Sequence, residues 1–390
     1  MLLSASGVPN LTPLAKIGKT TATINCPQTL SILPKERNFM ATHRIAVIAG
    51  DGIGPEVIDQ AIRATDKAVR GLATFEWNRL LWSSAYYKQH GRIMPEDGWD
   101  ILAKHDAILF GAIGSPDVPD KVTVHDLLLP MRRKFDEYVN LRPAYLFPGV
   151  NGPLRDKAPG SIDMLVYREN TEGEYAPIGG RLYEGTADEV AVQAATFTRR
   201  GCERIIRAAF EAARKRPRKK LTSITKSNAL VYGMMLWDDA AKAVAKDYPD
   251  VNFSSLLVDA AAMDFVRKPE NFDVIVASNL FGDILTDLSA AVTGSIGLAS
   301  SANINPDRKY PSMFEPVHGS APDIAGKGIA NPLAAILSAA LMLDHLKEAK
   351  AADALRAAVA KVLKEGKTMP PDLGGKATTV ELGDAVLGAL

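Results

Sequence analysis

The chain has 390 residues, of which 47% are hydrophobic and 23% charged, and its formal net charge is +1. This length suits about two domains, and the balanced charge argues against nucleic acid or an acidic membrane surface as the partner. The two cysteines, Cys26 and Cys202, form no CxxC pair, which argues against a disulfide framework or a thiolate metal site. Few cysteines and no apolar run long enough to span a membrane predict a cytoplasmic protein.

The first 39 residues differ in composition from the rest of the chain. They carry four basic residues and one acidic residue, with many Ser, Thr and Pro. This composition suits an organellar transit segment, although an arginine-rich amphipathic helix is not evident. Because the sequence from Met40 onward begins like a natural protein start (MATHRIAVIAGDG), we expect residues 1–39 to be a dispensable and poorly ordered extension.

Beyond residue 40, apolar strand-like runs alternate with helical periodicity. Buried strands are predicted at 45–49, 107–110, 162–167, 221–225, 255–258 and 274–277. Helices are predicted at 57–69, after Pro95, at 197–214 and at 333–346. This alternation predicts an α/β architecture. The segment 173–185, rich in Gly and Tyr, interrupts the alternation and is predicted to form a hairpin or an arm.

The loop GDGIG, residues 50–54, lies between the first predicted strand and the first predicted helix. Its third glycine comes one residue too early for the GxGxxG fingerprint, and no acidic residue ends a second strand at the expected distance. Pro55 suits the first turn of the helix. Two interpretations remain open: a tight strand-to-helix turn, or a turn pressed against a cofactor without the usual pyrophosphate geometry.

Two aspartates follow the strand predicted at 274–277. Asp283 and Asp287 are four residues apart, so both project from one face of a helix, where two like charges are unfavourable unless a cation neutralises them. Carboxylate oxygens suit Mg²⁺ or Mn²⁺. Alternatively, one aspartate caps the helix and the other is solvated. Asp259, at the end of the apolar run SLLVDA, is a candidate third ligand.

Three arginines, a tyrosine and a lysine are candidates for binding and catalysis. Arg132, Arg142 and Arg168 each lie beside an apolar segment rather than in a run of charges. Taken singly, each more commonly forms a surface ion pair, but three converging guanidinium groups would bind a dianionic acid. Tyr175 follows in RENTEGEY, and Lys226 closes the strand LTSIT, where it is placed to act as a base near a metal.

Seven motifs occur together and in order. They are GDGIGPE, RRKFDEYVNLRP, RENTEGEY, TKSN, VDAAAMDFV, ASNLFGDILTD and EPVHGSAPDIAGKGIANP. In this combination they resemble the β-decarboxylating dehydrogenases, the family of isocitrate and isopropylmalate dehydrogenases. The resemblance implies a two-domain α/β fold that is not a Rossmann fold of the usual kind. Residues 40–137 and 295–390 would form a cofactor-binding domain, and residues 138–294 a substrate and dimerisation domain with an arm at 173–190.

The resemblance also implies roles for individual residues. Tyr175 would act as the acid that protonates the enol carbon, and Lys226 as the base that takes the hydroxyl proton. The substrate would contact Arg132, Arg142, Arg168 and Leu128.

The same resemblance implies a metal site and a nucleotide site. The metal, Mg²⁺ or Mn²⁺, would bind Asp259, Asp283 and Asp287. NAD would bind Ile53, His318, Gly319, Ser320, Ala321, Asp323 and Asn331. The second subunit contributes the positions that match Lys226 and Asp259, which implies a homodimer with shared active sites.

Segments outside these motifs favour one branch of the family. WSSAYYKQHGRIMPEDG and FTRRGCERI are similar to the tartrate and D-malate dehydrogenases, which implies D-malate or tartrate as substrate. His125 and Asp126, however, stand where that branch usually has a Trp-Gly pair. If these polar side chains face the substituent at C3 of the substrate, they disfavour an isopropyl group there. Leu128 and Leu129 resemble residues that contact an isopropyl group in the other branch, so 3-isopropylmalate is the alternative substrate. A non-catalytic dicarboxylate-binding relative is disfavoured, because an acid, a base and metal ligands are all present.

Overall fold

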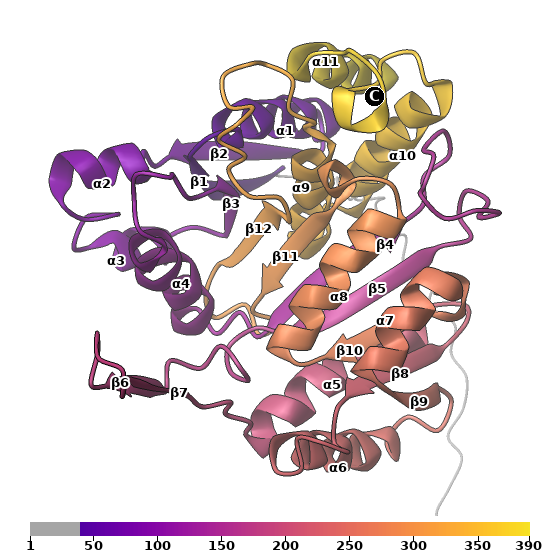
Figure 1. The fold of residues 1–390 in the computed structure, drawn as a ribbon. Helices are drawn as coiled ribbons and strands as arrows, with labels where there is room; N and C mark the ends of the chain where they lie inside the picture. Colours follow the sequence, from indigo (N-terminus) through magenta and orange to yellow (C-terminus); the bar gives the residue numbers. More distant parts are fainter. Residues whose placement is uncertain (1–39) are drawn as a thin grey trace, which may run out of the picture. The chain divides into compact units, whose positions relative to one another are not determined.

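The computed structural model describes residues 40–390, and the extension expected at residues 1–39 lies outside the described residues. Most of its strands join one sheet. These are β1 (Ala41–Gly50), β2 (Ala73–Arg79), β3 (Ala107–Ala112), β4 (Val139–Tyr145), β5 (Asp163–Glu169), β8 (Lys220–Thr225), β9 (Asn252–Leu257), β10 (Val274–Ala277), β11 (Ser300–Ile304) and β12 (Ser312–Pro316). Their order in space is β2-β1-β3-β12-β11-β4-β5-β10-β8-β9 (Figure 1).

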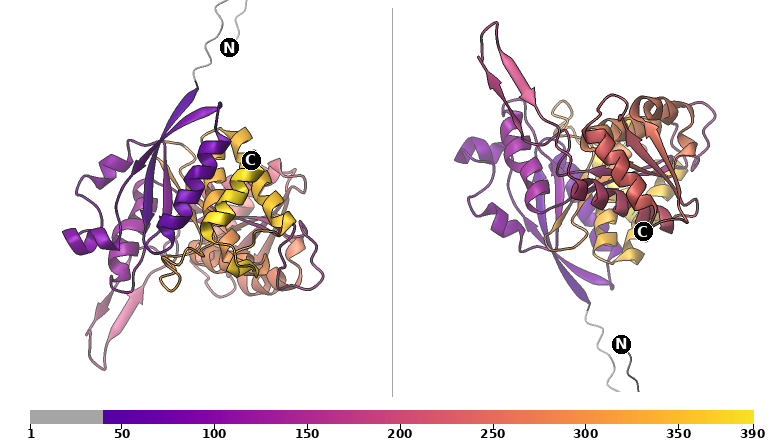
Figure 2. Two further views of the ribbon diagram at one scale, coloured as in Figure 1. Left: turned by 90° about the horizontal axis from the view of Figure 1, so that it is seen from above. Right: turned by 90° about the horizontal axis from the view of Figure 1, so that it is seen from below.

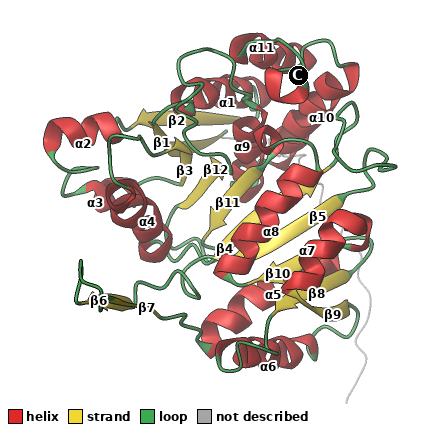
Figure 3. Cartoon of the chain, viewed as in Figure 1, coloured by secondary structure: helices red, strands yellow, loops and turns green. Residues whose placement is uncertain are grey.

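Helices cover both faces of this sheet (Figure 3). They are α1 (Gly54–Ala68), α2 (Ser84–His90), α3 (Gly98–Leu102), α4 (Leu129–Lys134), α5 (Arg199–Lys215), α6 (Gly233–Ala245), α7 (Val258–Arg267), α8 (Asn279–Val292), α9 (Leu333–His345), α10 (Ala349–Glu365) and α11 (Thr379–Ala389). The predicted α/β class is therefore confirmed. In the described part of the chain, no helix has the length and apolar character needed to cross a membrane.

Strand β1 illustrates how the sequence builds two cores. Successive side chains of a strand point to opposite faces, and both faces of β1 are buried. Ile45 and Val47 join the core beneath α1 and α9, whereas Ala46 and Ile48 join a second cluster with Leu102 of α3. A continuous apolar run is what a strand buried on both faces requires.

The sheet changes direction near its middle. Strand β11 is antiparallel to both β12 and β4, and β4 is antiparallel to β5, while the outer strands pair in parallel. The β11–β4 pair joins strands from residues 40–137 and 295–390 to strands from residues 138–294. The sheet is thus continuous across the predicted domain boundary, and the domain assignment itself stays a prediction.

Three predicted elements differ in extent. The strand predicted at 255–258 is β9, which ends at Leu257, so Asp259 lies in the first turn of α7 and not at a strand end. The helix expected after Pro95 is the five-residue α3. The arm is an antiparallel hairpin of β6 (Gly179–Leu182) and β7 (Val190–Gln193), which projects away from the main sheet (Figure 2).

Candidate active site

A cavity of about 220 Å³ brings most of the predicted substrate residues together. It opens where β3 and β12 end, which is the edge of an α/β sheet at which ligands bind. Six of its lining residues, from separate elements, were predicted to bind substrate or metal or to act in catalysis: Leu128, Arg132, Arg142, Arg168, Tyr175 and Asp283. His318 and Gly319 from the predicted nucleotide motif line the same cavity.

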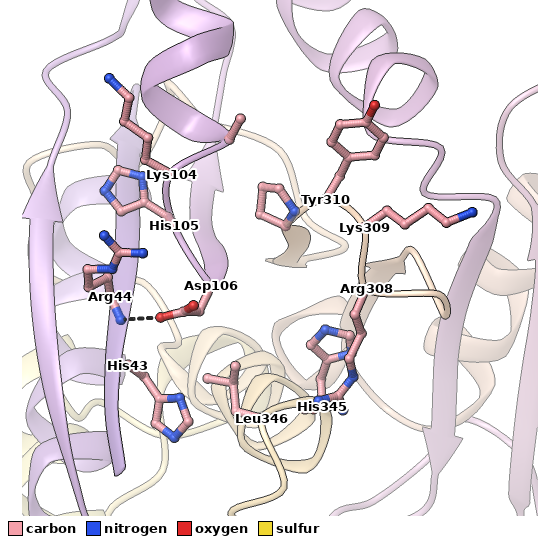
Figure 4. Close-up of a pocket in the computed structure, with 12 residues that line it drawn as sticks. His43, Arg44, Lys104, His105, Asp106, Arg308, Lys309, Tyr310, His345 and Leu346 are labelled. Carbon is pink, nitrogen blue, oxygen red and sulfur yellow. Dashed lines mark hydrogen bonds between the residues drawn. The ribbon is translucent and has the colours of Figure 1, made fainter.

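A larger cavity of about 390 Å³ lies where β1 and β3 begin (Figure 4). None of the predicted site residues lines it. Its one carboxylate, Asp106, accepts a hydrogen bond from the backbone N–H of Arg44 at 2.7 Å. The side chains of Lys104 and Lys309 point away from its centre (Figure 4). Size alone therefore does not identify the functional site.

The three arginines of the smaller cavity are buried, and neighbouring side chains accept hydrogen bonds from their guanidinium groups. Arg168 donates through Nε and Nη2 to Asn279 Oδ1, at 3.0 and 2.7 Å, and through Nη1 to Asp283. Arg142 donates to Thr286 Oγ1 at 2.7 Å. Because their exposure is only 1% to 7%, these are not the surface ion pairs that each arginine alone would suggest. Arg132 Nε and Arg142 Nε are buried without an acceptor in the described chain, so these guanidinium groups keep donors for a carboxylate ligand.

Asp283 is the centre of this charge cluster. Its Oδ1 accepts hydrogen bonds from Arg168 Nη1 and, at 3.4 Å, from Arg142 Nη1, while its Oδ2 accepts a hydrogen bond from the Tyr175 hydroxyl at 2.7 Å. Burial opposes ionisation, but Arg168 and Arg142 outweigh it and lower the pKa of Asp283. Burial and the hydrogen bond to Asp283 raise the pKa of Tyr175 to about 12. Tyr175 therefore keeps its proton at neutral pH and is a candidate acid.

The donor set at Asp283 and Asp287 fits a hard divalent cation. Both carboxylates lie on α8, with Asp287 Oδ1 3.8 Å from Arg142 Nη1. Burial raises the pKa of Asp287, and a bound cation would offset that effect. Magnesium in enzymes is commonly held by one or two carboxylates together with substrate oxygens. Among residues 40–390 of a single chain, no three acidic, His or Cys side chains gather at one point.

Lys226 and Asp259 lie together, apart from the cavity. Lys226 Nζ donates to Asp259 Oδ1 at 2.6 Å, from the end of β8 to the first turn of α7. Their side chains are 28% and 59% exposed. The predicted base and the predicted third metal ligand thus form an accessible ion pair that does not line the cavity of their own chain.

The predicted nucleotide residues occupy two loops that touch. Ile53 N donates to Ser320 O at 2.9 Å, and a side chain at Gly52 would lie 1.9 Å from that oxygen, which explains the glycine. The GDGIG loop is thus a tight strand-to-helix turn packed against the second predicted nucleotide loop, an arrangement that both interpretations of it allow. Ala321 has a positive φ of 42°, an uncommon backbone conformation of the kind that clusters at ligand sites.

The remaining nucleotide residues differ in their surroundings. Burial lowers the pKa of His318, whose Nε2 is buried without a hydrogen-bond partner in the described chain. A neutral imidazole with a free nitrogen is suited to a nucleotide base or ribose. Asp323 is exposed. Asn331 donates to Asp372 at 3.0 Å and accepts from Leu333 N at 3.0 Å, so its contacts within the chain are structural.

The sequence analysis missed three residues that hold the arginines. Asn279 and Thr286 lie on α8 within the motif ASNLFGDILTD, and Glu315 opens the motif EPVHGSAPDIAGKGIANP. Glu315 Oε1 accepts from Arg132 Nη2 at 2.8 Å. Their positions inside motifs were the available signal, but the pairing of Glu315 with Arg132 depends on β12, which was not predicted.

The comparisons with known proteins extend over nearly all of the described chain. Residues 44–386 match the isocitrate/isopropylmalate dehydrogenase family. The chain is 52% identical over 357 residues to D-malate dehydrogenase [decarboxylating] of Escherichia coli (strain K12), covering 89% of this chain and 98% of that protein. It is 49% identical to the tartrate dehydrogenase/decarboxylase of Pseudomonas putida, covering 89% and 97%. Isocitrate dehydrogenase from Methylococcus capsulatus superimposes with a TM-score of 0.80 at 36% identity, covering 89% and 99%.

Fold and sequence together define an oxidoreductase of the dehydrogenase class. The chain belongs to the isocitrate/isopropylmalate dehydrogenase family. The resemblance stated from its motifs is therefore confirmed. Enzymes of this family generally depend on NAD(P) and on a divalent metal.

Proposed function

We propose that the protein catalyses the NAD- and metal-dependent oxidative decarboxylation of a small 2-hydroxy diacid, D-malate or tartrate. One observation carries the proposal: three buried arginines, a protonated tyrosine and Asp283 surround a single small cavity. The arginines suit two carboxylates, and a cavity of about 220 Å³ suits a small acid. The 52% identity to a D-malate dehydrogenase supports the choice of substrate.

The side chains divide the chemistry between them. Arg132, Arg142 and Arg168 bind and orient the two carboxylates. The Tyr175 hydroxyl donates a hydrogen bond to Asp283 Oδ2 at 2.7 Å. In the reaction Tyr175 delivers that proton to the carbon that loses CO₂. Lys226 of the partner subunit accepts the proton of the substrate hydroxyl. When bound at Asp283 and Asp287, with Asp259 of the partner subunit, a divalent cation would polarise the substrate oxygens and stabilise the charge that develops during decarboxylation.

The substrate argument from His125 and Asp126 needs correction. Both residues are exposed on the π-helix Lys121–Leu128, and neither lines the cavity of its own chain. Leu129 does not line it either, whereas Leu128 does. These polar residues therefore do not face the C3 substituent from their own chain, and they give no reason to exclude an isopropyl group. The preference for D-malate or tartrate rests on the similarity of the whole chain instead.

The ratio of kcat/KM for D-malate to kcat/KM for 3-isopropylmalate tests this choice. We expect a ratio well above one, because the chain is similar over its length to a D-malate dehydrogenase and an added apolar substituent changes specificity by about tenfold or more. The measurement is steady-state kinetics with both acids at saturating cofactor. A ratio below one would assign the enzyme to the isopropylmalate branch of the family, whereas the proposed type of reaction would stay the same.

We further propose NAD rather than NADP as the cofactor. Asp323 is exposed in the loop that contains His318 and Gly319. A carboxylate there accepts hydrogen bonds from ribose hydroxyls and repels a 2′-phosphate. We expect kcat/KM to be at least about tenfold higher with NAD, since like charges in contact cost several kcal/mol. Asp323→Lys should narrow that ratio, and equal efficiency with both nucleotides in the wild type would contradict this role of Asp323.

The proposal includes a homodimer in the cytoplasm. Large apolar side chains are exposed on α7 and α8 at Met263, Val266 and Ile284, and on the arm at Leu182 and Val192. An exposed apolar surface next to the Lys226–Asp259 pair suits a second copy of the chain, which would bring that pair to a neighbouring cavity. In the described chain, Cys202 is a buried free thiol, as suits a reducing compartment.

A further inference from the structure

A buried amide lies where the segments that carry the three arginines meet. Asn303, on β11, is 0% exposed. Its Oδ1 accepts hydrogen bonds from Asn140 Nδ2 at 2.8 Å and from Asn170 Nδ2 at 2.9 Å. Its Nδ2 donates to Glu315 Oε1 at 2.7 Å. Each of these three partners is itself at least nine-tenths buried.

Each hydrogen-bond partner of Asn303 is close to a different arginine of the cavity, either two residues away in the chain or through a direct hydrogen bond. Asn140 precedes Arg142 by two residues on β4, and residues two apart on a strand project from the same face. Asn170 follows Arg168 by two residues at the end of β5.

The third contact reaches an arginine through a carboxylate. Glu315 Oε1 also accepts from Arg132 Nη2 at 2.8 Å. Arg132 Nε is buried and has no acceptor in the described chain, so Glu315 is the side chain that holds this guanidinium. Any shift of Glu315 would therefore move Arg132.

The orientation of the Asn303 amide is determined by its neighbours. Exchanging its oxygen and nitrogen would direct N–H groups at the N–H donors of Asn140 and Asn170. The same exchange would set the amide oxygen against the Glu315 carboxylate. Asn303 therefore has one arrangement in which every contact is favourable, and this arrangement requires an acceptor and a donor on one short side chain.

Asn303 lies at the junction between the part of the sheet that holds Arg132 and the part that carries the other two arginines. Arg132 belongs to α4 and is held by β12, whereas Arg142 and Arg168 belong to β4 and β5. The junction between these groups is the antiparallel β11–β4 pair, in which Asn303 is the register partner of Asn140. The Asn303 side chain thus connects the arginine of one half of the sheet to the two arginines of the other half.

We propose that Asn303 is a positioning residue that sets the spacing between Arg132 and the pair Arg142 and Arg168, and thereby the length of diacid accepted. The proposal rests on the proposed function, since it requires that these arginines bind substrate. The two carboxylates of a diacid are separated by a distance that its carbon chain fixes. A displacement of one arginine relative to the other two changes which chain length fits.

The test compares two leucine variants two residues apart, one on β11 and one just beyond the end of that strand. Asn303→Leu removes every contact of the amide. Asn305→Leu is the matched control, because Asn305 is also buried, at 3% exposure, and donates to Phe135 O at 2.8 Å rather than to the arginine network. For each variant, kcat and KM are measured with D-malate, with the five-carbon homologue 2-hydroxyglutarate and with NAD. Binding of unreactive succinate and glutarate is measured by calorimetry on the full chain.

For Asn303→Leu we expect KM for D-malate to rise about tenfold and the preference for the four-carbon acid to fall about tenfold. Small displacements of positioning groups have effects of this size. KM for NAD should not change. Asn305→Leu should lose thermal stability but keep its chain-length preference. An Asn303→Leu enzyme that is folded and retains the wild-type preference would overturn the role of Asn303.

Asn303→Asp is the second variant for this test, used if Asn303→Leu does not fold. Its Oδ1 keeps both acceptor contacts, but its second oxygen faces Glu315 and can donate only when the new carboxyl is protonated. The ratio of the variant's KM for D-malate to the wild-type KM should therefore fall as the pH is lowered. A ratio that does not change with pH would contradict the proposal. A wild-type enzyme that neither binds succinate nor oxidises any diacid would instead refute the proposed function.

Discussion

Turnover is expected to stop when divalent metal is removed, and to fall by about two to three orders of magnitude in Asp283→Asn. Asp283 lies between Arg168, Arg142 and Tyr175, so its charge both organises the binding cluster and supplies a candidate metal ligand. Loss of that charge leaves two buried guanidinium groups without their anion. The measurement is the initial rate after exhaustive chelation, followed by titration with Mn²⁺ or Mg²⁺.

A second variant separates metal binding from the arrangement of the arginines. Asp287 is more exposed, its side chain at 63%, and approaches Arg142 only to 3.8 Å. Asp287→Asn should therefore raise the metal concentration needed for half-maximal rate while leaving the binding of succinate nearly unchanged. Asp353→Asn, on the exposed face of α10, is the control. Full activity in metal-free buffer would exclude the assignment of Asp283 and Asp287 as metal ligands.

Mixing two inactive variants is expected to restore activity, because each active site would draw residues from both chains. Tyr175 lines the cavity of its own chain, whereas Lys226 pairs with Asp259 away from it. In a hybrid of Tyr175→Phe and Lys226→Ala, one site carries both substitutions and the other carries neither. Random exchange should therefore restore about one quarter of wild-type activity. The measurement is the rate after subunit exchange, with hybrid formation verified by native mass spectrometry.

The structure also provides a mixture that should remain inactive. Tyr175 and Asp283 belong to one cavity of one chain, joined at 2.7 Å. In a hybrid of Tyr175→Phe and Asp283→Asn, each site retains one defect, so exchange should restore nothing. Recovery in this mixture as well would point to reversion or contamination. Absence of recovery in both mixtures after verified exchange would refute the shared site.

The sequence by itself predicted the architecture and the class of enzyme. Apolar runs such as 274–277, which coincides with β10, are local signals of a strand buried on both faces. The order of seven motifs indicated the family, because a long set of short patterns carries information that no single motif has. The pairing of Asp283 with Asp287 was also local, since residues four apart share one helix face whatever the rest of the chain does.

Only the tertiary structure decided how the arginines are held. Asn303 and Asn140 are 163 residues apart, and Arg132 and Glu315 are 183 apart. Such contacts exist only because β11 and β12 enter the middle of the sheet, and these five-residue strands, SSANI and SMFEP, do not show the long apolar runs that predict strands. Likewise, only the structure shows that His125 and Asp126 are exposed on the π-helix Lys121–Leu128 and do not line the cavity of their own chain. Periodicity reports what is buried along one element, whereas the partners of a buried polar group depend on which elements the fold brings together.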